Sequence, residues 1–226
     1  MELKTIAHFD SPFSSKFGIP RQSGLVESLK GKIIFEQEYR NPDFIRGIEG
    51  VDYLWIIWGF SANKHEATSP VVRPPVLGGN EKRGVFATRS PFRPNPIGLS
   101  SVMIDYIDYN SPVGPTIYVK GSDLMDGTPI YDIKPYLPYT DSHPEARGGF
   151  SAPFVFQQLN VSMNDSLKNI FSDDDIQTLR DILAQDPRPR YINDPQRIYG
   201  MPFLNYDIRF RIADNIVEIV EAVRLV

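Results

Sequence analysis

The run Tyr53-Leu-Trp-Ile-Ile-Trp-Gly-Phe60 lies in the longest apolar stretch of the chain, from about Val51 to Phe60. Short runs like it, rich in β-branched and aromatic residues and separated by turn signals, are typical of an antiparallel sheet or barrel. We therefore expect a mainly β fold. The predicted strands are Leu3 to Phe9, Ile33 to Glu36, Tyr53 to Phe60, Gly84 to Thr88, Ser101 to Tyr109, Thr116 to Lys120 and Pro129 to Ile133.

A single short helix is expected to interrupt these strands. The segment Asn41-Pro-Asp-Phe-Ile-Arg-Gly47 has an N-cap residue, proline at the first helical position and a terminal glycine. Within the opening run, Trp55 and Trp58 point to opposite faces at strand period. We expect both to be buried; the alternative is that one of them covers a neighbouring subunit or a second domain.

The pattern changes at Thr140-Asp-Ser-His-Pro-Glu-Ala-Arg-Gly-Gly149, which is polar and has no periodicity. We therefore predict one domain over residues 1–145 and a small α+β domain over residues 151–226. In the second domain the expected elements are a strand at Phe154 to Val161, a helix, and closing strands at Tyr206 to Ile212 and Ile216 to Val223. Ser172, followed by three aspartates, marks the helix start, and the helix ends before Asp186.

Composition limits the function classes. The 226 residues include 41% hydrophobic and 23% charged residues, which is ordinary for a globular protein. There is no cysteine, so disulfides, thiolate metal sites and a cysteine nucleophile are excluded. The N-terminus has no basic region followed by an apolar run, and the longest apolar stretch is too short to span a bilayer. We expect a cytoplasmic protein.

Charge is distributed unevenly along the chain. The formal net charge of -4 argues against bulk electrostatic attraction to nucleic acid. Between Arg73 and Arg93, however, five basic residues stand against the single acid Glu81. Such a local positive patch can receive an anionic ligand.

The segment Arg89-Ser-Pro-Phe-Arg-Pro-Asn-Pro-Ile-Gly-Leu-Ser100 lies at the end of this patch. Its prolines fix φ and remove amide donors, so a stiff loop is expected up to Ile97. Arg89 and Arg93 can bind a carboxylate or phosphate, and Asn95 can bind an amide or a base edge. The alternative is a stiff corner between strands with solvated arginines.

Two further segments combine glycine and proline with polar side chains. Asp123-Leu-Met-Asp-Gly-Thr-Pro-Ile-Tyr-Asp132 predicts a tight turn at Asp126-Gly127, with either metal binding or solvated acids around it. Phe17-Gly-Ile-Pro-Arg-Gln-Ser-Gly24 is a weaker signal. No GxGxxG or P-loop pattern is present, so a Rossmann or NTPase fold has no support. The three histidines are scattered and are not expected to bind a metal.

A set of glycine- and proline-containing segments recurs over residues 1 to about 145: Pro20-Arg-Gln22, Val71-Val-Arg-Pro-Pro75, Leu77-Gly-Gly-Asn80, Gly84-Val-Phe-Ala-Thr-Arg-Ser90, Phe92-Arg-Pro-Asn-Pro-Ile-Gly98, Asp126-Gly-Thr-Pro and Asp132-Ile-Lys-Pro-Tyr136. Together these segments resemble the TsaA/YaeB-like family, the TrmO tRNA methyltransferases. Beyond the linker, Leu183-Ala-Gln-Asp-Pro-Arg-Pro-Arg-Tyr191 and Asp207-Ile-Arg-Phe-Arg211 resemble the C-terminal domain of two-domain members.

The resemblance implies a fold and an activity. The expected fold is a single-sheeted antiparallel β-barrel, and the expected assembly is a homodimer with the cofactor near its interface. The expected activity is S-adenosylmethionine-dependent methylation of N6 of threonylcarbamoyladenosine, next to the anticodon of tRNA, without a metal. The implied cofactor-binding residues are Pro20, Arg21, Gln22, Ser61, Ala62, Arg89, Leu99, Asp126, Gly127, Thr128 and Pro129. Many relatives have histidine at Ser61, so a main-chain contact is expected there.

The chemistry of the quoted segments fits this activity. An arginine suits the cofactor carboxylate, amide and backbone groups suit adenine, and carboxylates or carbonyls suit the sulfonium. Asp126 is the candidate for accepting the N6 proton. A splayed base in a single-stranded loop can be bound by Arg93 and Asn95, with Arg188, Arg190, Arg209 and Arg211 on the anticodon stem-loop backbone. A non-catalytic RNA-binding adaptor and a small-molecule methyltransferase are the alternatives.

The tRNA hypothesis predicts an effect of charge reversal in the C-terminal domain. The double variant Arg188→Glu, Arg190→Glu should bind tRNA more weakly, because phosphate contacts are lost, and should bind cofactor as before. Titrations of each ligand check this. Equal loss of both affinities would reject the assignment.

Overall fold

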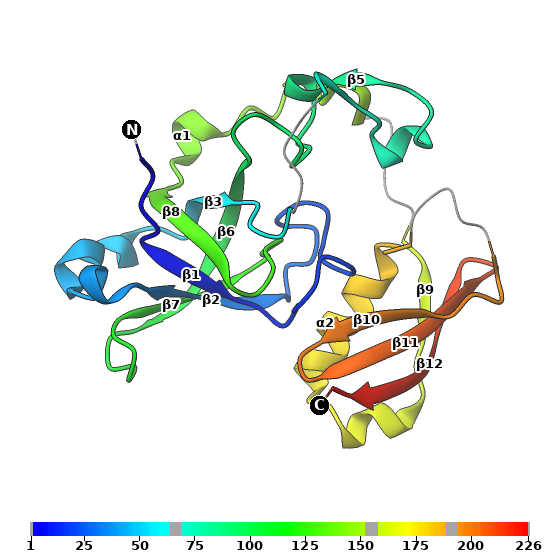
Figure 1. The fold of residues 1–226 in the computed structure, drawn as a ribbon. Helices are drawn as coiled ribbons and strands as arrows, with labels where there is room; N and C mark the ends of the chain where they lie inside the picture. The colour runs from blue at the N-terminus through cyan, green and yellow to red at the C-terminus, as the bar shows by residue number, and fades with distance from the viewer. Residues whose placement is uncertain (1, 64–68, 152–157, 189–193, 226) are drawn as a thin grey trace.

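The structure is a computed structural model of the chain, and it describes residues 2–63, 69–151, 158–188 and 194–225 (Figure 1). Two hydrophobic cores organise these residues. One lies inside the N-terminal sheet, and the other lies between a helix and a second sheet near the C-terminus. In these ranges the structure has no helix that is both long and apolar enough to cross a membrane.

Six strands form the N-terminal sheet, which closes into a barrel in the order β1-β2-β7-β6-β3-β8. Every pair is antiparallel, and β1 closes the ring because Ala7 pairs with both Phe35 and Ile130. Closure leaves no exposed strand edge. The antiparallel, mainly β prediction is therefore confirmed. The strands are β1 (Ala7–Asp10), β2 (Lys30–Phe35), β3 (Tyr53–Gly59), β6 (Ile97–Asp108), β7 (Thr116–Lys120) and β8 (Thr128–Pro135).

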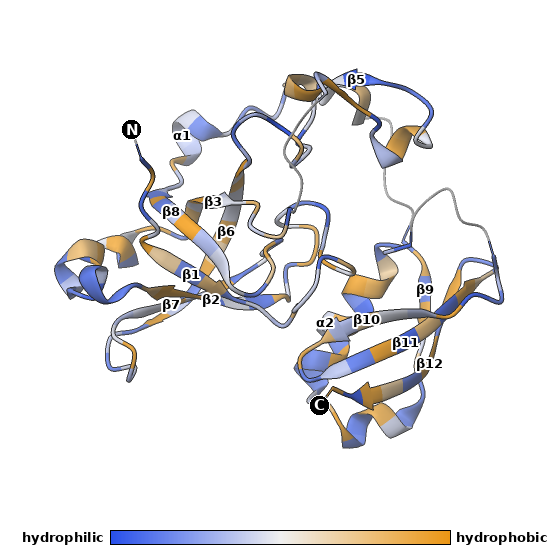
Figure 2. Ribbon diagram, viewed as in Figure 1, coloured by the Kyte–Doolittle hydropathy of each residue, from blue (hydrophilic) through white to orange (hydrophobic). Residues whose placement is uncertain are grey.

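The C-terminal sheet has the order β10-β11-β12-β9, with β9 parallel to β12 and the other pairs antiparallel. Figure 2 shows hydrophobic and hydrophilic positions alternating along β11, whose apolar face lies on the core. The two closing strands are confirmed, and the expected strand at Phe154 falls partly outside the described residues. The strands are β9 (Asn160–Ser162), β10 (Tyr199–Phe203), β11 (Tyr206–Ala213) and β12 (Ile216–Arg224).

Helix α2 (Asp173–Ala184) begins and ends as the sequence predicts. Ser172 Oγ accepts a hydrogen bond from the amide of Asp175 at 3.2 Å, and the first turn carries three acids. Its apolar face, which includes Leu179 and Ile182, is buried against the sheet.

The connections contain more helical turns than expected, so the prediction of a single short helix is wrong. The predicted turn after Asn41 is present as a 3₁₀ segment, and Asn41 accepts a hydrogen bond from the amide of Asp43. The other short segments are Gln37–Tyr39, Ile48–Gly50, Pro75–Leu77, Val85–Ala87, Gly149–Ser151 and Asp165–Asn169 in 3₁₀ form, and α1 (Pro138–Asp141).

The predicted strand from Gly84 to Thr88 is also wrong. Only Arg83–Gly84 (β5) pairs, with Val71–Val72 (β4), and the chain then enters a 3₁₀ turn. Thr88 donates from both its amide and its Oγ1 to the carbonyl of Val85. These local bonds replace a strand ladder.

The two tryptophans of β3 do lie on opposite faces, but they are not both buried. Trp58 is 8% exposed. Trp55 is half-buried and donates its Nε1 proton to Asp141 at 2.7 Å. The outer face of β3 therefore packs on the start of the linker rather than on a core.

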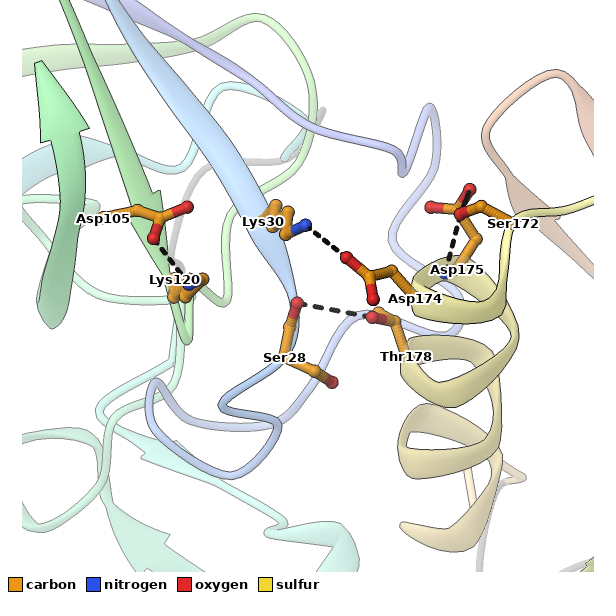
Figure 3. Close-up of polar contacts among 8 residues, drawn as sticks. All are labelled: Ser28, Lys30, Asp105, Lys120, Ser172, Asp174, Asp175 and Thr178. Carbon is orange, nitrogen blue, oxygen red and sulfur yellow. Dashed lines mark hydrogen bonds and ion pairs between the residues drawn. The ribbon is translucent and has the colours of Figure 1, made fainter.

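The segment between β1 and β2 belongs to both halves of the molecule. Phe13, Val26 and Leu29 are buried in the C-terminal core, although they come from the N-terminal part of the chain. Around them, Lys30 pairs with Asp174 at 2.9 Å, and Thr178 donates to the carbonyl of Ser28 at 3.3 Å (Figure 3). The ion pair is exposed and contributes little, and Thr178 adds one part-buried hydrogen bond, so the apolar anchors provide most of the attachment between the two parts.

Truncating one anchor tests this interface. Phe13 is fully buried and packs edge-on against Phe203 at 6.1 Å between ring centroids. We expect Phe13→Ala to lower the free energy of unfolding by about 3–5 kcal/mol, because it leaves a cavity between the two parts. Urea unfolding measures this loss. Phe44, whose ring is 63% exposed, is the control, and its alanine variant should lose about 1 kcal/mol or less. Equal small losses would contradict the assignment.

Candidate active site

A cavity of about 750 Å³ lies at the end of the barrel where β3 ends and β6 begins. Its size is that of a pocket for a small organic ligand. Most of its lining comes from five segments: Ile19 to Gln22, Trp58 to Asn63, the proline-rich loop before β6, the start of β6, and the connection between β7 and β8 up to Thr128. Lys16, Trp55 and Phe86 complete it. These segments are far apart in the sequence, and barrel closure brings them together.

The proline-rich loop forms one wall through Pro91, Arg93, Pro94 and Asn95. Main-chain hydrogen bonds between residues two positions apart set its shape. The amide of Arg93 donates to the carbonyl of Pro91 at 3.0 Å, and the amide of Ile97 donates to the carbonyl of Asn95 at 2.7 Å. The amide of Phe60 donates to the carbonyl of Pro96 at 2.9 Å, which ties the loop to the end of β3. The loop is therefore a preformed wall, on which Arg93 is half-buried and donates to the carbonyl of Thr88 at 3.2 Å, whereas Arg89 is exposed.

The floor of the cavity contains a chain of hydrogen bonds. Trp58 Nε1 donates to Ser100 Oγ at 2.9 Å, and Ser100 Oγ donates to Asp123 Oδ1 at 2.5 Å. Gly98 makes this arrangement possible, because a Cβ there would lie 2.2 Å from Trp58 Cε2. Side chains from β3, β6 and the connection before β8 are thus held in one array.

Burial raises the pKa of the Asp123 carboxyl above its ordinary value. The hydrogen bond from Ser100, main-chain amides at Ser23 and Asp123, and the charge of Arg89 all act in the opposite direction, and burial outweighs them. Asp123 is thus a carboxyl group whose charged form is costly in this fold. Such groups are frequent at functional sites.

Cations predominate around the cavity. Among the described residues, Lys16, Arg21, Arg89 and Arg93 line it, against the single acid Asp123. Arg89 donates to the side chain of Gln22, and Arg21 donates to the main-chain carbonyl of Asp186 at 3.2 Å. The site therefore suits an anionic or zwitterionic ligand.

Most of the residues predicted from the sequence come together here. Those lining the cavity are Pro20, Arg21, Gln22, Ser61, Ala62, Arg89, Leu99 and Thr128 from the cofactor set, and Arg93 and Asn95 from the substrate set. Asp126, Gly127 and Pro129 are outside the lining. Asp126 is exposed and accepts a hydrogen bond from the amide of Ser11 at 3.2 Å, and Gly127 N donates to Phe9 O.

Of the four C-terminal arginines, Arg190 lies outside the described residues, and Arg188, Arg209 and Arg211 do not line this cavity. Arg188 pairs with Asp186 at 2.9 Å, Arg209 pairs with both Asp207 and Glu221, and Arg211 pairs with Glu218. The positive charge of these three side chains is therefore largely balanced locally.

Sequence reasoning missed Asp123, Trp58 and Phe60 as site residues. The segment from Asp123 to Asp132 contains three acids, and the sequence does not distinguish the half-buried carboxyl of Asp123 from the exposed carboxyl of Asp126. The available signal was Gly98, a strand glycine that marks a close approach by another group. Within the described residues, no group of three or more His, Asp or Glu side chains is placed to hold a metal ion.

Comparison with known families gives two matches that together span most of the chain. Residues 8–142 match the tRNA-methyltransferase O N-terminal domain, and residues 157–225 match the TrmO C-terminal domain. The chain is 37% identical over 228 residues to the tRNA (adenine(37)-N6)-methyltransferase of Escherichia coli, with 94% of each chain covered.

Two proteins of Pseudomonas aeruginosa are also similar. The first, provisionally named as an S-adenosylmethionine-dependent methyltransferase, is 33% identical over 213 residues, which cover 91% of this chain and 90% of that protein. The second is TrmO, known from a crystal structure. Its fold superposes on this chain with a TM-score of 0.77 at 26% sequence identity, and the superposition covers 98% of each chain.

The raised pKa of Asp123 predicts a pH-dependent stability effect. The folded chain binds this proton more tightly than the unfolded chain, so stability falls as pH rises from the ordinary carboxyl value through the folded pKa. Asp123→Asn keeps an acceptor for Ser100 and removes the charge. We expect the variant to melt at a higher temperature than the parent at neutral pH, and the difference to vanish below about pH 4.

Asp132→Asn is the matched control, because Asp132 lies in the same segment but pairs with Lys134 in solvent. It should change stability by about 0.5 kcal/mol or less. Thermal melts across pH measure all three proteins. A variant at Asp123 that is less stable than the parent at neutral pH would contradict the electrostatic argument.

Proposed function

The chain belongs to the tRNA-methyltransferase O family, and we propose that it transfers a methyl group from S-adenosylmethionine to N6 of adenine 37 in tRNA. The proposed base is threonylcarbamoyladenosine. The observation that carries the proposal is the convergence of ten predicted residues, eight for cofactor and two for substrate, on one cavity beside the half-buried Asp123.

The residues of the cavity fit the cofactor. S-adenosylmethionine, when bound, supplies an electrophilic methyl group on a sulfonium. Arg21 and Arg89 are suited to its carboxylate, and the aromatic floor formed by Trp58 and Phe60 is suited to its adenine. Gln22, Ser61 and Ala62 add amide and main-chain groups along the same wall. Cofactor contacts by Asp126, Gly127 and Pro129 remain predictions, because these three residues do not line the cavity.

The chain contributes mainly alignment. Methyl transfer needs an in-line approach of the nucleophilic nitrogen, and a preformed wall reduces the entropic cost of that alignment. The hydrogen bond between Phe60 and Pro96 fixes the position of the wall relative to β3. Arg93 and Asn95 lie on the same wall, where they can bind the substrate base after it leaves its stack.

The substrate itself carries a negative charge, because its threonyl group ends in a carboxylate. Four cations line the cavity, which is more than one cofactor carboxylate requires. We assign Arg93 to the threonyl carboxylate. The C-terminal arginines Arg188, Arg190, Arg209 and Arg211 are proposed to contact the anticodon stem-loop. Arg188, Arg209 and Arg211 now pair with carboxylates, and they would exchange these partners for phosphates on binding.

The remaining proposals concern organisation. Residues 1–145 are proposed to hold cofactor and catalysis, and residues 151–226 to contact tRNA in the cytoplasm. A homodimer is proposed because apolar side chains at the cavity are exposed: Phe86 is 77% exposed and Leu99 is 56% exposed. A second copy of the barrel would cover them.

Mass spectrometry of tRNA nucleosides tests the activity. Purified protein is incubated with S-adenosylmethionine and tRNA that carries threonylcarbamoyladenosine. We expect this nucleoside to gain the mass of one methyl group, and only when cofactor is present. No gain on a verified substrate would contradict the proposal. A gain on free nucleosides equal to that on tRNA would instead indicate a small-molecule methyltransferase.

Cofactor binding is tested separately by thermal melts with S-adenosylhomocysteine. Saturable stabilisation is expected, amounting to about 2.7 kcal/mol at a hundredfold excess over Kd. Absence of any stabilisation would identify a binding module that lacks the cofactor.

A further inference from the structure

Asp123 lies on the cavity floor, and none of the expected roles uses it. We propose that the Asp123 carboxylate accepts the N6 proton of the substrate base during methyl transfer. This inference rests on the proposed function and assigns the general base of that reaction.

Position is the first argument. Among the described residues lining the cavity, Asp123 is the only carboxylic acid. It comes from the connection between β7 and β8, and it lines the same cavity as Arg93 and Asn95 of the proline-rich loop. The proposal requires that a base held by Arg93 and Asn95 directs its N6 edge toward Asp123. A proton acceptor must lie within hydrogen-bond reach of the reacting atom, and among the described lining residues Asp123 offers the only carboxylate.

The Asp123 side chain is also held in a defined orientation. Ser100 donates to its Oδ1 at 2.5 Å, and Ser100 is itself fixed by the bond from Trp58. Ser100 is 1% exposed, so this support is shielded from water. Such a chain fixes the direction of the second carboxylate oxygen. Ser100 is therefore a positioning residue.

The surroundings make this carboxylate a stronger base than an exposed one. Burial disfavours its charge, and the groups that favour the charge come from three elements: Ser100 on β6, the Ser23 amide between β1 and β2, and Arg89 on the proline-rich loop. Lys16, Arg21 and Arg93 are the other charged groups lining the cavity. A base whose pKa lies closer to neutral pH transfers protons more effectively.

The step balances with the reactants already named. Asp123 takes the N6 proton while the nitrogen lone pair forms a bond to the methyl carbon. The bond from that carbon to sulfur breaks, and its electron pair stays on sulfur. The products are the N6-methylated base, the uncharged thioether and a protonated Asp123, which returns its proton to solvent after release.

Asp126, the candidate from the sequence, is less suited to this role. Its side chain is exposed, and its carboxylate accepts from the Ser11 amide outside the cavity. That bond stabilises the turn before β8. The distinction between two aspartates three positions apart depends on which one the barrel mouth encloses.

Single-turnover kinetics of Asp123→Asn at saturating S-adenosylmethionine test the proposal. The variant keeps the shape of the side chain and its acceptor for Ser100, but it cannot take the proton. We expect methyl transfer to slow by about 10²- to 10⁴-fold. Binding of S-adenosylhomocysteine should stay within about threefold of the parent, which corresponds to less than 1 kcal/mol. Asp132→Asn, in the same segment but outside the lining, should react at the parental rate.

The pH dependence gives a readout that a purely structural role would not change. The parental rate should rise with pH until Asp123 is ionised and then level off, and this inflection should be absent in Asp123→Asn. In Ser100→Ala a bond that favours the charged carboxylate is lost, so the inflection should move to higher pH. Carbon-13 NMR of the Asp123 carboxyl in the cofactor-free protein should show the same upward shift of its titration.

The outcomes separate this inference from the proposed function. If the parent methylates tRNA and Asp123→Asn does so at a similar rate, the inference fails and the function stands. If Asp123→Asn loses cofactor affinity but keeps its rate at saturation, Asp123 is a cofactor ligand and the inference is also overturned. If the parent shows no activity on verified substrate, the proposed function itself fails.

Discussion

The constraint on which the site depends is the set of prolines at positions 91, 94 and 96, which removes three amide donors directly before β6. The loop cannot continue the ladder of β6, so it leaves the barrel and turns over its mouth. The hydrogen bond from Phe60 to the carbonyl of Pro96 then attaches it to the end of β3. As a result the cavity wall is fixed before any ligand arrives, and little entropy is lost on binding.

The electrostatics of the cavity follow from this enclosure. In the part of the chain that the structure describes, four cations line its walls and one half-buried carboxyl, that of Asp123, lies on its floor. Outside the cavity, arginines such as Arg209 and Arg211 pair with neighbouring acids. An acidic chain with a net charge of -4 can therefore still offer a concentrated positive site to an anionic ligand. Partial burial of Asp123 disfavours its charged form and so reduces stability, as is expected for a reactive group at such a site.

Much of the fold could be predicted from the sequence because most strands bury one face. Strand β7 matches its predicted bounds, and α2 has an N-cap that local chemistry specifies. Strand β10 was missed because Gly200 and Pro202 argue against a strand. Because β10 lies at the edge of the sheet and pairs only with β11, the missing amide proton of Pro202 breaks no hydrogen bond to a second neighbouring strand.

The site was predictable where a segment had a distinctive composition, as with Arg89 and Arg93. It was not predictable where tertiary burial decides the chemistry. Asp123 and Asp126 look alike in the sequence, and only the approach of Ser100 and Trp58 distinguishes them. The turn at Val85 was missed for a similar reason. The carbonyl of Val85 accepts hydrogen bonds from Thr88 rather than from a neighbouring strand.

The most direct measurement is a crystal structure with S-adenosylhomocysteine and a short anticodon stem-loop carrying threonylcarbamoyladenosine. The account predicts the cofactor between Arg21, Arg89 and the aromatic floor, with N6 of the base within hydrogen-bond distance of Asp123. A cofactor bound elsewhere, or an N6 atom directed away from Asp123, would contradict it.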